Sequence, residues 1–324
     1  MDALSDVLRV TRLTGGVFLH ADFSAPWCID GRVSPEFCGP AVGLASHIIP
    51  YHYVVDGEME VAVAGFDADQ VKVGAGEIVL LPHNDIHRLG SSLAIPPVEA
   101  SKLMQPTENG GLFTIRYGGG GKPVHVVCGY LGCDRSDHNP LIAALPRILK
   151  MDVDEGSGAE WIRSTFQFAA EEVAAGRLGS GTILAKLSEL LFVETIRRYV
   201  EGLPEGQTGW LAGLRDPYVA RMLSLFHYDV ARPWTISELS RETGLSRSAL
   251  ADRFVDLIGM APIQYLAHWR MQVAAQELRN TSATLAQIAA IVGYESEASF
   301  SRAFKKSFGS APASWRRAAR FQDG

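Results

Sequence analysis

The clearest capacity for chemistry lies near the end of the chain, in the stretch LAQIAAIVGYESEASFSRAFKKSFGSAPASW, Leu285 to Trp315. Read with a helical period of 3.6 residues, Arg302 and Lys305 fall on one side of a helix. The opposite side carries Phe300, Phe304 and Phe308, which predicts a buried aromatic stripe. Exposed guanidinium and ammonium groups neutralise nucleic acid phosphates, so we expect phosphate contacts from Lys305, Lys306, Arg316 and Arg317.

Thiols are a second group with possible chemistry. The chain has four cysteines, too few for a disulfide scaffold: Cys28, Cys38, Cys128 and Cys133. Cys128 and Cys133 lie near each other in sequence and are the candidates for a redox sensor, which requires an exposed thiol with a lowered pKa. Buried, unreactive cysteines are the favoured interpretation, and a thiol-based redox-sensing regulator stays as an alternative.

The helices and the turn that must position the basic face of Arg302 and Lys305 occur twice in the sequence. Thr284 and Gln287 predict a capping box at the start of a helix, and Thr235 and Glu238 predict the same box earlier. Eight further positions recur at an offset of 49 that becomes 50 after the turn, which indicates one structural unit used twice. Ile236, Leu239, Gly244, Leu250, Phe254, Gly259, Pro262 and Tyr265 recur as Leu285, Ile288, Gly293, Phe300, Phe304, Gly309, Pro312 and Trp315.

A single helix is predicted between the two copies. Residues 263–280 contain neither proline nor glycine, and a helix of this length spans roughly 27 Å. Gly244 and Gly293 can each take the positive φ that turns one helix into the next. The spacing suits two recognition helices that enter the major groove about one DNA turn, roughly 34 Å, apart.

The segment from about Leu214 to Arg320 resembles the DNA-binding domain of the AraC/XylS family of transcription regulators. The resemblance is carried by TISELSRETGLSRSALADRF, PIQYLAHWRMQVA and IAAIVGYESEASFSRAFKKSFGSAPASWRR. It implies a sequence-specific regulator with double-stranded DNA as its partner, and with RNA polymerase as a further partner if it activates transcription. We expect the protein not to be an enzyme.

The resemblance also implies which residues of the second motif face the bases: Ala298, Ser301 and Arg302. Arg302 can donate two hydrogen bonds to guanine, worth roughly 1 to 3 kcal/mol of discrimination. In the first motif Asp252 aligns with Arg302, and a carboxylate repels phosphates, so we expect the second copy to supply most base readout. The candidate DNA contacts of the first motif are Ser246, Arg247, Ser248, Ala249 and Asp252.

Residues 1 to about 130 show short alternating apolar runs, which predict an all-β module. Strands are expected at 51–55, 59–64, 70–73, 77–81, 113–117 and 124–127. GEIVLLPHNDIH resembles the second cupin motif through Gly76, Pro82, Asn84 and His87, with Asn84 in place of the usual glycine. VVDGEMEV resembles the first cupin motif. Cupin sensor domains of this kind occur in AraC-family regulators, and the resemblance implies an unknown small-molecule effector.

Histidines are the candidates for the pocket of this module: His47, His52, His83 and His87. Cupins often hold a metal through three histidines and a carboxylate, here with Glu58 as the possible carboxylate. His47 and His52 are five residues apart, a spacing that does not place both on one strand face. We therefore expect no cofactor, with His52 and His87 as the ligands if a metal binds. A metal-dependent cupin enzyme fused to a DNA-binding module stays as an alternative.

The expected architecture is an α+β multidomain protein: a cupin-like β-barrel followed by helices, then an all-α domain with two helix-turn-helix motifs joined by a long helix. Helices are predicted at 141–151, 160–175, 182–201 and 216–230. The resemblance implies that those after the barrel form a homodimer contact. The expected segments are a sensor (1–138), a helical connector and dimerisation region (139–201), a linker (202–213) and a DNA-binding domain (214–324).

The charge is distributed unevenly along the chain. Residues 1–212 hold 16 Lys+Arg and 26 Asp+Glu (16 − 26 = −10), and residues 213–324 hold 14 and 10 (14 − 10 = +4), which gives the net −6. Because salt screens fields beyond about 10 Å, the local excess decides attraction to phosphates. The sequence has no run of 18 apolar residues and no secretion signal, so we expect a cytoplasmic protein without a membrane contact.

Overall fold

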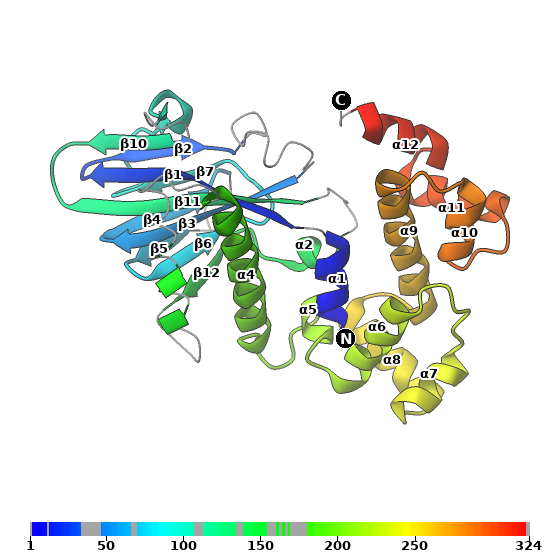
Figure 1. Ribbon diagram of the computed structural model, residues 1–324. Coiled ribbons are helices and arrows are strands. Elements are labelled where there is room, and N and C mark those ends of the chain that lie inside the picture. The colour runs from blue at the N-terminus through cyan, green and yellow to red at the C-terminus, as the bar shows by residue number, and fades with distance from the viewer. Residues whose placement is uncertain are drawn as a thin grey trace. The chain divides into compact units, whose positions relative to one another are not determined.

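The computed structural model describes residues 2–11, 13–33, 47–65, 70–106, 113–133, 139–153, 160–161, 164–165, 168 and 180–321. Contacts within the chain divide it into two compact units. The β-unit comprises Leu13–Arg135 and Leu145–Tyr199, and the helical unit comprises Met1–Arg12, Ser136–Ala144 and Val200–Gly324. Figure 1 shows the strands and helices of each unit.

Two β-sheets form most of the β-unit (Figure 1). Neighbouring strands pair antiparallel except β1 with β10 and β2 with β8, which pair parallel. The larger sheet has the order β12-β6-β3-β11-β1-β10-β9, formed by β1 (Thr14–Ser24), β3 (His47–Asp56), β6 (Glu77–Leu80), β9 (Gln105–Pro106), β10 (Phe113–Gly118), β11 (Pro123–Cys133) and β12 (Leu149–Asp152). The smaller has the order β5-β4-β7-β2-β8, formed by β2 (Cys28–Gly31), β4 (Glu58–Val63), β5 (Gln70–Gly74), β7 (His87–Gly90) and β8 (Val98–Glu99).

The two sheets share one hydrophobic core. Leu19, Val54 and Ile115 of the larger sheet pack with Val61 and Leu89 of the smaller one. Alternate residues of a strand point to the same side of a sheet, so each strand contributes one face to this core. The six strands expected in this module are present as β3, β4, β5, β6, β10 and β11, of which β3 and β11 are longer than expected.

One predicted helix differs from the structure, and one helix was not predicted. A helix, α1 (Ala3–Thr11), lies in the part expected to contain only strands. The helix predicted at 141–151 was wrong in its second half: α2 (Pro140–Ala144) ends before Pro146, and β12 then pairs with β6. Proline disfavours helix at the preceding residue, and the free edge of β6 supplies backbone partners for a strand. Most of the helix predicted at 160–175 lies outside the described residues.

A long helix packs on the larger sheet of the β-unit. This helix, α4 (Ser180–Glu201), confirms the prediction at 182–201, and Phe192 and Ile196 are fully buried. The hydroxyl groups of Tyr51 and Ser188 are 2.7 Å apart and form a buried hydrogen bond between sheet and helix. A side chain at Gly15 would overlap the backbone of α4, so glycine is what permits the close approach. No described helix is long and apolar enough to cross a membrane.

The helical unit is built around one central helix. Figure 1 shows α9 with α6 to α8 near one end and α10 to α12 near the other. The prediction of a single helix at 263–280 is confirmed, because α9 has 19 residues. The elements are α5 (Trp210–Gly213), α6 (Pro217–Tyr228), α7 (Ile236–Thr243), α8 (Arg247–Ile258), α9 (Pro262–Asn280), α10 (Leu285–Ile291), α11 (Glu297–Phe308) and α12 (Pro312–Phe321).

The helical unit contains more than the DNA-binding domain expected at 214–324, because α1, α2 and α5 also belong to it. The stretch expected as a linker ends in α5, where Trp210 is buried and its indole donates to the hydroxyl of Tyr265 at 2.9 Å. Helix α1 packs against α6 beside the buried His227, whose pKa falls to about 3 because burial disfavours its charged form. Conversely, α4 is counted with the β-unit.

The turn glycines of the two repeats provide a matched pair of substitutions. Gly244 and Gly293 have φ of 79° and 74°, and an alanine in this region costs about 1 to 2 kcal/mol. A Cβ at Gly244 meets open space, whereas one at Gly293 overlaps the backbone of Ala231. Gly293→Ala is therefore expected to lower the free energy of unfolding clearly more than Gly244→Ala in denaturant titrations. Equal losses would contradict the close approach at Gly293.

Candidate nucleic-acid interface and ligand pocket

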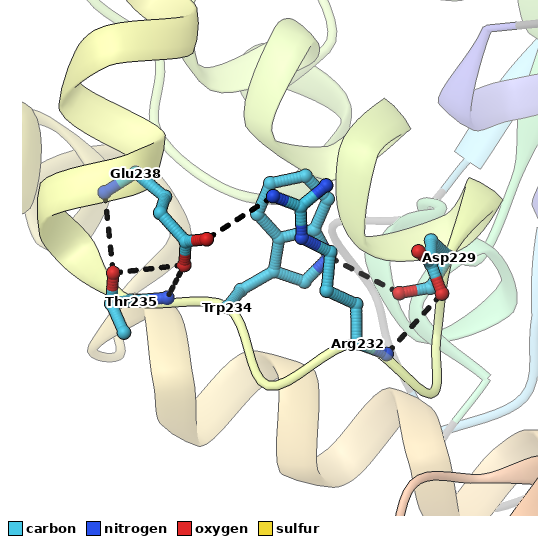
Figure 2. Close-up of polar contacts among 5 residues, drawn as sticks. All are labelled: Asp229, Arg232, Trp234, Thr235 and Glu238. Carbon is cyan, nitrogen blue, oxygen red and sulfur yellow. Dashed lines mark hydrogen bonds and ion pairs between the residues drawn. The ribbon is translucent and has the colours of Figure 1, made fainter.

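The first helix-turn-helix consists of α7 and α8. A cluster of polar contacts holds the loop before α7 and the first turn of α7 (Figure 2). The backbone N–H and hydroxyl of Thr235 both donate to the Glu238 carboxylate at 2.9 Å, and the Glu238 N–H donates to the Thr235 hydroxyl at 3.2 Å. The Arg232 guanidinium lies 4.1 Å above the Trp234 ring and donates to Glu238 at 3.1 Å. The Trp234 indole donates to the Asp229 carbonyl at 3.1 Å. The predicted capping box is thus present, and contacts of Arg232 and Trp234 stabilise the loop before it.

The second helix-turn-helix, α10 and α11, repeats this construction. Thr284 and Gln287 form the predicted capping box, and Ser296 caps α11 by accepting from the Ser299 N–H. Phe300 and Phe304 of the predicted aromatic stripe are buried, and the half-buried Phe308 stacks on Phe304 with ring centroids 4.6 Å apart. The remaining ring contacts extend from Tyr294 through Phe300 and Phe304 to Trp315.

The two motifs meet at Arg270 of α9. Its guanidinium donates to the carbonyl groups of Val230, Ala231 and Arg232 at 2.9, 3.1 and 2.9 Å. The same guanidinium lies 6.0 Å from the ring centre of Tyr294, just after the turn of the second motif. Bonds from one planar cation to three successive carbonyls resist rotation, so Arg270 holds the loop before the first motif beside the turn of the second. No feature of the repeat pattern points to this residue, because it lies between the copies.

The second motif exposes most of the residues predicted for it. Ala298, Arg302, Lys305, Lys306 and Arg317 are exposed, and Ser301 is half-buried. Arg316 is half-buried, and its guanidinium donates to the Ala283 carbonyl at 2.6 Å. This bond joins α12 to the residue before the α10 cap, and a phosphate contact by Arg316 stays a prediction.

The first motif presents a different surface. Arg247, Ser248, Ala249 and Asp252 are exposed, and the exposed Ser246 uses its hydroxyl to cap α8 at the Ala249 N–H. Helix α8 carries two basic and two acidic residues (2 − 2 = 0), whereas α11 carries three and one (3 − 1 = +2). One basic residue of α8, Arg253, is bound to Asp216 at 2.5 Å. The local field that attracts phosphates is therefore stronger at the second motif.

A pocket lies inside the β-unit between its two sheets. Its cavity volume is about 130 Å³, and fifteen residues line it. Of the four histidines predicted for such a pocket, His52 of β3 and His87 of β7 line it. The lining residues are Leu19, Phe23, Ile29, Gly31, Arg32, Val33, His52, His87, Leu89, Glu99, Ala100, Ser101, Met104, Ile115 and Cys128.

The polar groups at this pocket form a chain of hydrogen bonds. Nδ1 of His87 lies 3.0 Å from the Asp85 carbonyl and must donate to it, which leaves its Nε2 as an acceptor. Nε2 of His52 lies 3.1 Å from that nitrogen and donates to it, so Nδ1 of His52 accepts from the Cys128 thiol at 3.0 Å. Burial lowers the pKa of both histidines, so the hydrogen-bonded side chains of His52, His87 and Cys128 are neutral.

The other predicted pocket histidines lie elsewhere. Nε2 of His47 lies 2.7 Å from the Pro82 carbonyl, and Nε2 of His83 lies 2.9 Å from the Leu145 carbonyl. Glu58 is exposed. Among the described residues, no group of three or more histidine, cysteine or acidic side chains converges as a metal site. The two ring nitrogens of His52 diverge, so a metal shared with His87 through Nε2 would not reach Cys128, which lies at Nδ1.

Asn84 explains a departure from the cupin motif. It adopts φ of 52°, a left-handed conformation that asparagine tolerates better than most residues. Its side-chain amide also donates to the Val33 carbonyl at 2.9 Å. The position therefore keeps the backbone conformation for which the motif usually has glycine.

The cysteines predicted as redox candidates are both buried on β11. Burial raises the pKa of Cys128 to about 12, which opposes formation of the reactive thiolate. An odd separation of five positions along one strand places Cys128 and Cys133 on opposite faces, roughly 16 Å apart along the strand. The geometry thus opposes a disulfide between them. Cys38 lies outside the described residues.

Comparison with known proteins agrees with both halves of this description. A cupin family model matches residues 2–201, and a helix-turn-helix domain model matches residues 239–318. A putative AraC-like transcription regulator of Streptomyces lividans is 32% identical, over 98% of each chain. The chain belongs to the AraC-like transcription regulators.

Two further proteins are similar to this chain. A putative AraC-like regulator of Streptomyces antibioticus is 30% identical over 98% of this chain and 99% of its own. The structure of the DNA-binding domain of AdpA in complex with a target DNA is 26% identical, covers 33% of this chain and 96% of that one, and has a TM-score of 0.32. The resemblance and the expected role in DNA binding and transcription regulation are confirmed for this AraC-like regulator.

Base reading in this AraC-like regulator can be separated from phosphate binding by two substitutions on α11. Arg302→Ala is expected to relax sequence preference at one base pair, because the guanidinium no longer discriminates guanine by about 1 to 3 kcal/mol. Lys306→Ala is expected to weaken all duplexes alike and to reduce the slope of log affinity against log salt by about one. Affinities measured on matched and single-mismatch duplexes at several salt concentrations distinguish base reading by Arg302 from phosphate binding by Lys306. An unchanged preference in Arg302→Ala would refute base reading by Arg302.

The buried histidines predict how the stability of this AraC-like regulator depends on pH. Because the pKa values of His52 and His87 are lowered in the folded state, the unfolded chain binds more protons below pH 6.5. Stability is therefore retained above about pH 6.5 and falls on acidification, by up to about 1.4 kcal/mol per pH unit for each histidine. His87→Gln is expected to make this fall shallower in denaturant titrations from pH 7.5 to 5. The control, His125→Gln, removes a half-exposed ring and keeps both buried ones.

Proposed function

We propose that this AraC-like regulator binds a specific DNA site and that a small molecule in the β-unit pocket controls this binding. DNA-binding regulation follows from the family, and the effector is the proposed part. The observation that supports it is the lined, mostly apolar cavity of about 130 Å³ in the same chain as two helix-turn-helix motifs. Apolar cavities with a few polar groups are typical of small-molecule sites.

Control by an effector has a thermodynamic requirement. The molecule must bind two states of the regulator with different affinity, because a ligand with equal affinity for both shifts neither. By linkage, DNA must then change the affinity for the effector by the same factor. The coupling can therefore be measured from either side, on the effector or on the DNA.

The two motifs have unequal roles in this proposal. Helix α11, with net charge +2, reads bases through Arg302 and binds phosphates through Lys305, Lys306 and Arg317. Helix α8, with net charge 0 and Asp252 on its exposed face, contributes placement through Arg247 and Ser248. An activator would in addition contact RNA polymerase.

A homodimer through α4 completes the proposal. Ile183 and Leu190 are 40% and 49% exposed and are seven residues apart, so they lie on one face of the helix. Apolar side chains on one face of a helix are suited to the same face of a second copy, as in isologous dimers. Two copies would present four helix-turn-helix motifs to the DNA.

The dimer is tested by sedimentation of full-length Leu190→Glu. A buried pair of carboxylates would oppose association, so we expect this variant to sediment as a monomer at concentrations where the unchanged protein is a dimer. Thr182→Glu is the control, because Thr182 is also exposed on α4 but about 100° around the helix. Dimers in both variants would exclude this face as the contact.

Specific DNA binding is tested by selection from a random duplex library with the full chain. We expect an enriched sequence with two parts about one DNA turn apart, one with a stronger base preference than the other. Arg302→Ala should weaken the base preference of the more specific part. Absence of any enriched sequence would overturn the proposal. Two alternatives are checked on the same material: stoichiometric metal that is lost in His52→Ala would favour a metal-dependent enzyme, and DNA binding that depends on oxidant would favour a thiol sensor.

A further inference from the structure

Among the described residues of the β-unit pocket, His52, His87 and Cys128 form a floor whose hydrogen-bond donors are already used, which restricts what can bind there. The Cys128 thiol donates to His52, His52 donates to His87, and His87 donates to the Asp85 carbonyl. Each donor is therefore used before a ligand arrives. A ligand that must accept several hydrogen bonds would have to break this chain, and breaking buried bonds without replacement is costly.

The same floor has no charge to compensate a charged ligand. Both histidines are neutral because burial lowers their pKa, and burial raises the pKa of Cys128. The ionic residues of the lining are Arg32 and Glu99, both exposed. Glu99 is already bound to Lys102 at 3.1 Å. An ionised group beside His52, His87 and Cys128 would thus be buried without a partner, which strongly disfavours its binding there.

Part of the lining also suits a flat aromatic ring. Phe23, His52 and His87 present aromatic rings, and Met104 and Cys128 present sulfur atoms. Rings and sulfur atoms interact favourably with the faces and edges of an aromatic ligand. A volume of about 130 Å³ is close to that of engineered apolar cavities of roughly 150 Å³ that bind benzene.

From the bonded floor, the absence of interior charge and the ring-and-sulfur lining, we propose that this pocket binds an uncharged, single-ring aromatic compound. The inference rests on the proposed function, because it names the chemical class of the effector. The ring occupies the cavity between the two sheets, and any polar substituent points to the rim at Arg32 and Ser101.

The test compares toluene with benzoate, a charged analogue of similar size, by calorimetry and ligand-observed NMR on the full-length protein. We expect saturable binding of toluene with one site per chain, and at least tenfold weaker binding of benzoate. Benzoate that binds as tightly as toluene would overturn the proposal. Loss of that benzoate binding in Arg32→Ala would then identify an aromatic acid held at the rim instead.

Filling the pocket provides the matched control. Ala100 lines the cavity and packs against the core, so Ala100→Leu and Ala100→Phe should occupy it progressively and weaken toluene binding in that order. Ala94→Phe adds the same ring at an exposed position outside the lining and should leave toluene binding unchanged. If Ala100→Phe does not fold, Ala100→Leu with its smaller side chain still provides the test. Unchanged toluene binding in a folded Ala100 variant would place the toluene elsewhere and refute the inference.

DNA affinity measured on the same samples separates the two proposals. Protein that selects a DNA sequence but does not bind toluene contradicts only the aromatic ligand. Protein that binds toluene but selects no DNA sequence contradicts the proposed regulation by DNA binding. Protein that does both, with a DNA affinity shifted at saturating toluene, supports both.

Discussion

The three hydrogen bonds from Arg270 to the carbonyls of Val230, Ala231 and Arg232 are the constraint on which the DNA-binding surface depends. A double helix-turn-helix can read one DNA site only if its recognition helices keep a fixed separation and angle. Helix α9 sets the separation, because its 19 residues form one uninterrupted element. Arg270 and the close approach at Gly293 set the angle, since they hold the loop before the first motif beside the turn of the second.

On this common frame, the two copies differ in charge. Duplication keeps the buried positions, the caps and the turns, because each is required for the unit to fold. The exposed positions have no such requirement, and there Asp252 stands in the first copy where Arg302 stands in the second. Since charge on the exposed face decides the attraction to phosphates, similar folds lead to unequal contributions in DNA binding.

The β-unit keeps polar side chains in its apolar interior by pairing them with one another. His52 and His87 come from different sheets, and their hydrogen bond joins the two layers across the pocket. Cys128 and the Asp85 carbonyl satisfy the remaining ring nitrogens, so neither ring is left with an unpaired donor. The consequence is a pocket with defined walls and a neutral floor, in which recognition depends on shape and on apolar contact.

The sequence by itself determined the elements whose signals are local. The capping boxes at Thr235 and Thr284, the turn glycines and the aromatic stripe of α11 depend on residues within a few positions of one another, and all are present. Tertiary structure alone decided features that join distant residues: β12 became a strand because β6 offered a free edge, and Arg316 of α12 donates to the carbonyl of Ala283. The histidine pocket followed the same rule. The sequence favoured His52 and His87 over His47 and His83, but it could not show that the two rings meet, because that contact depends on strand pairing and sheet packing across 35 residues of sequence.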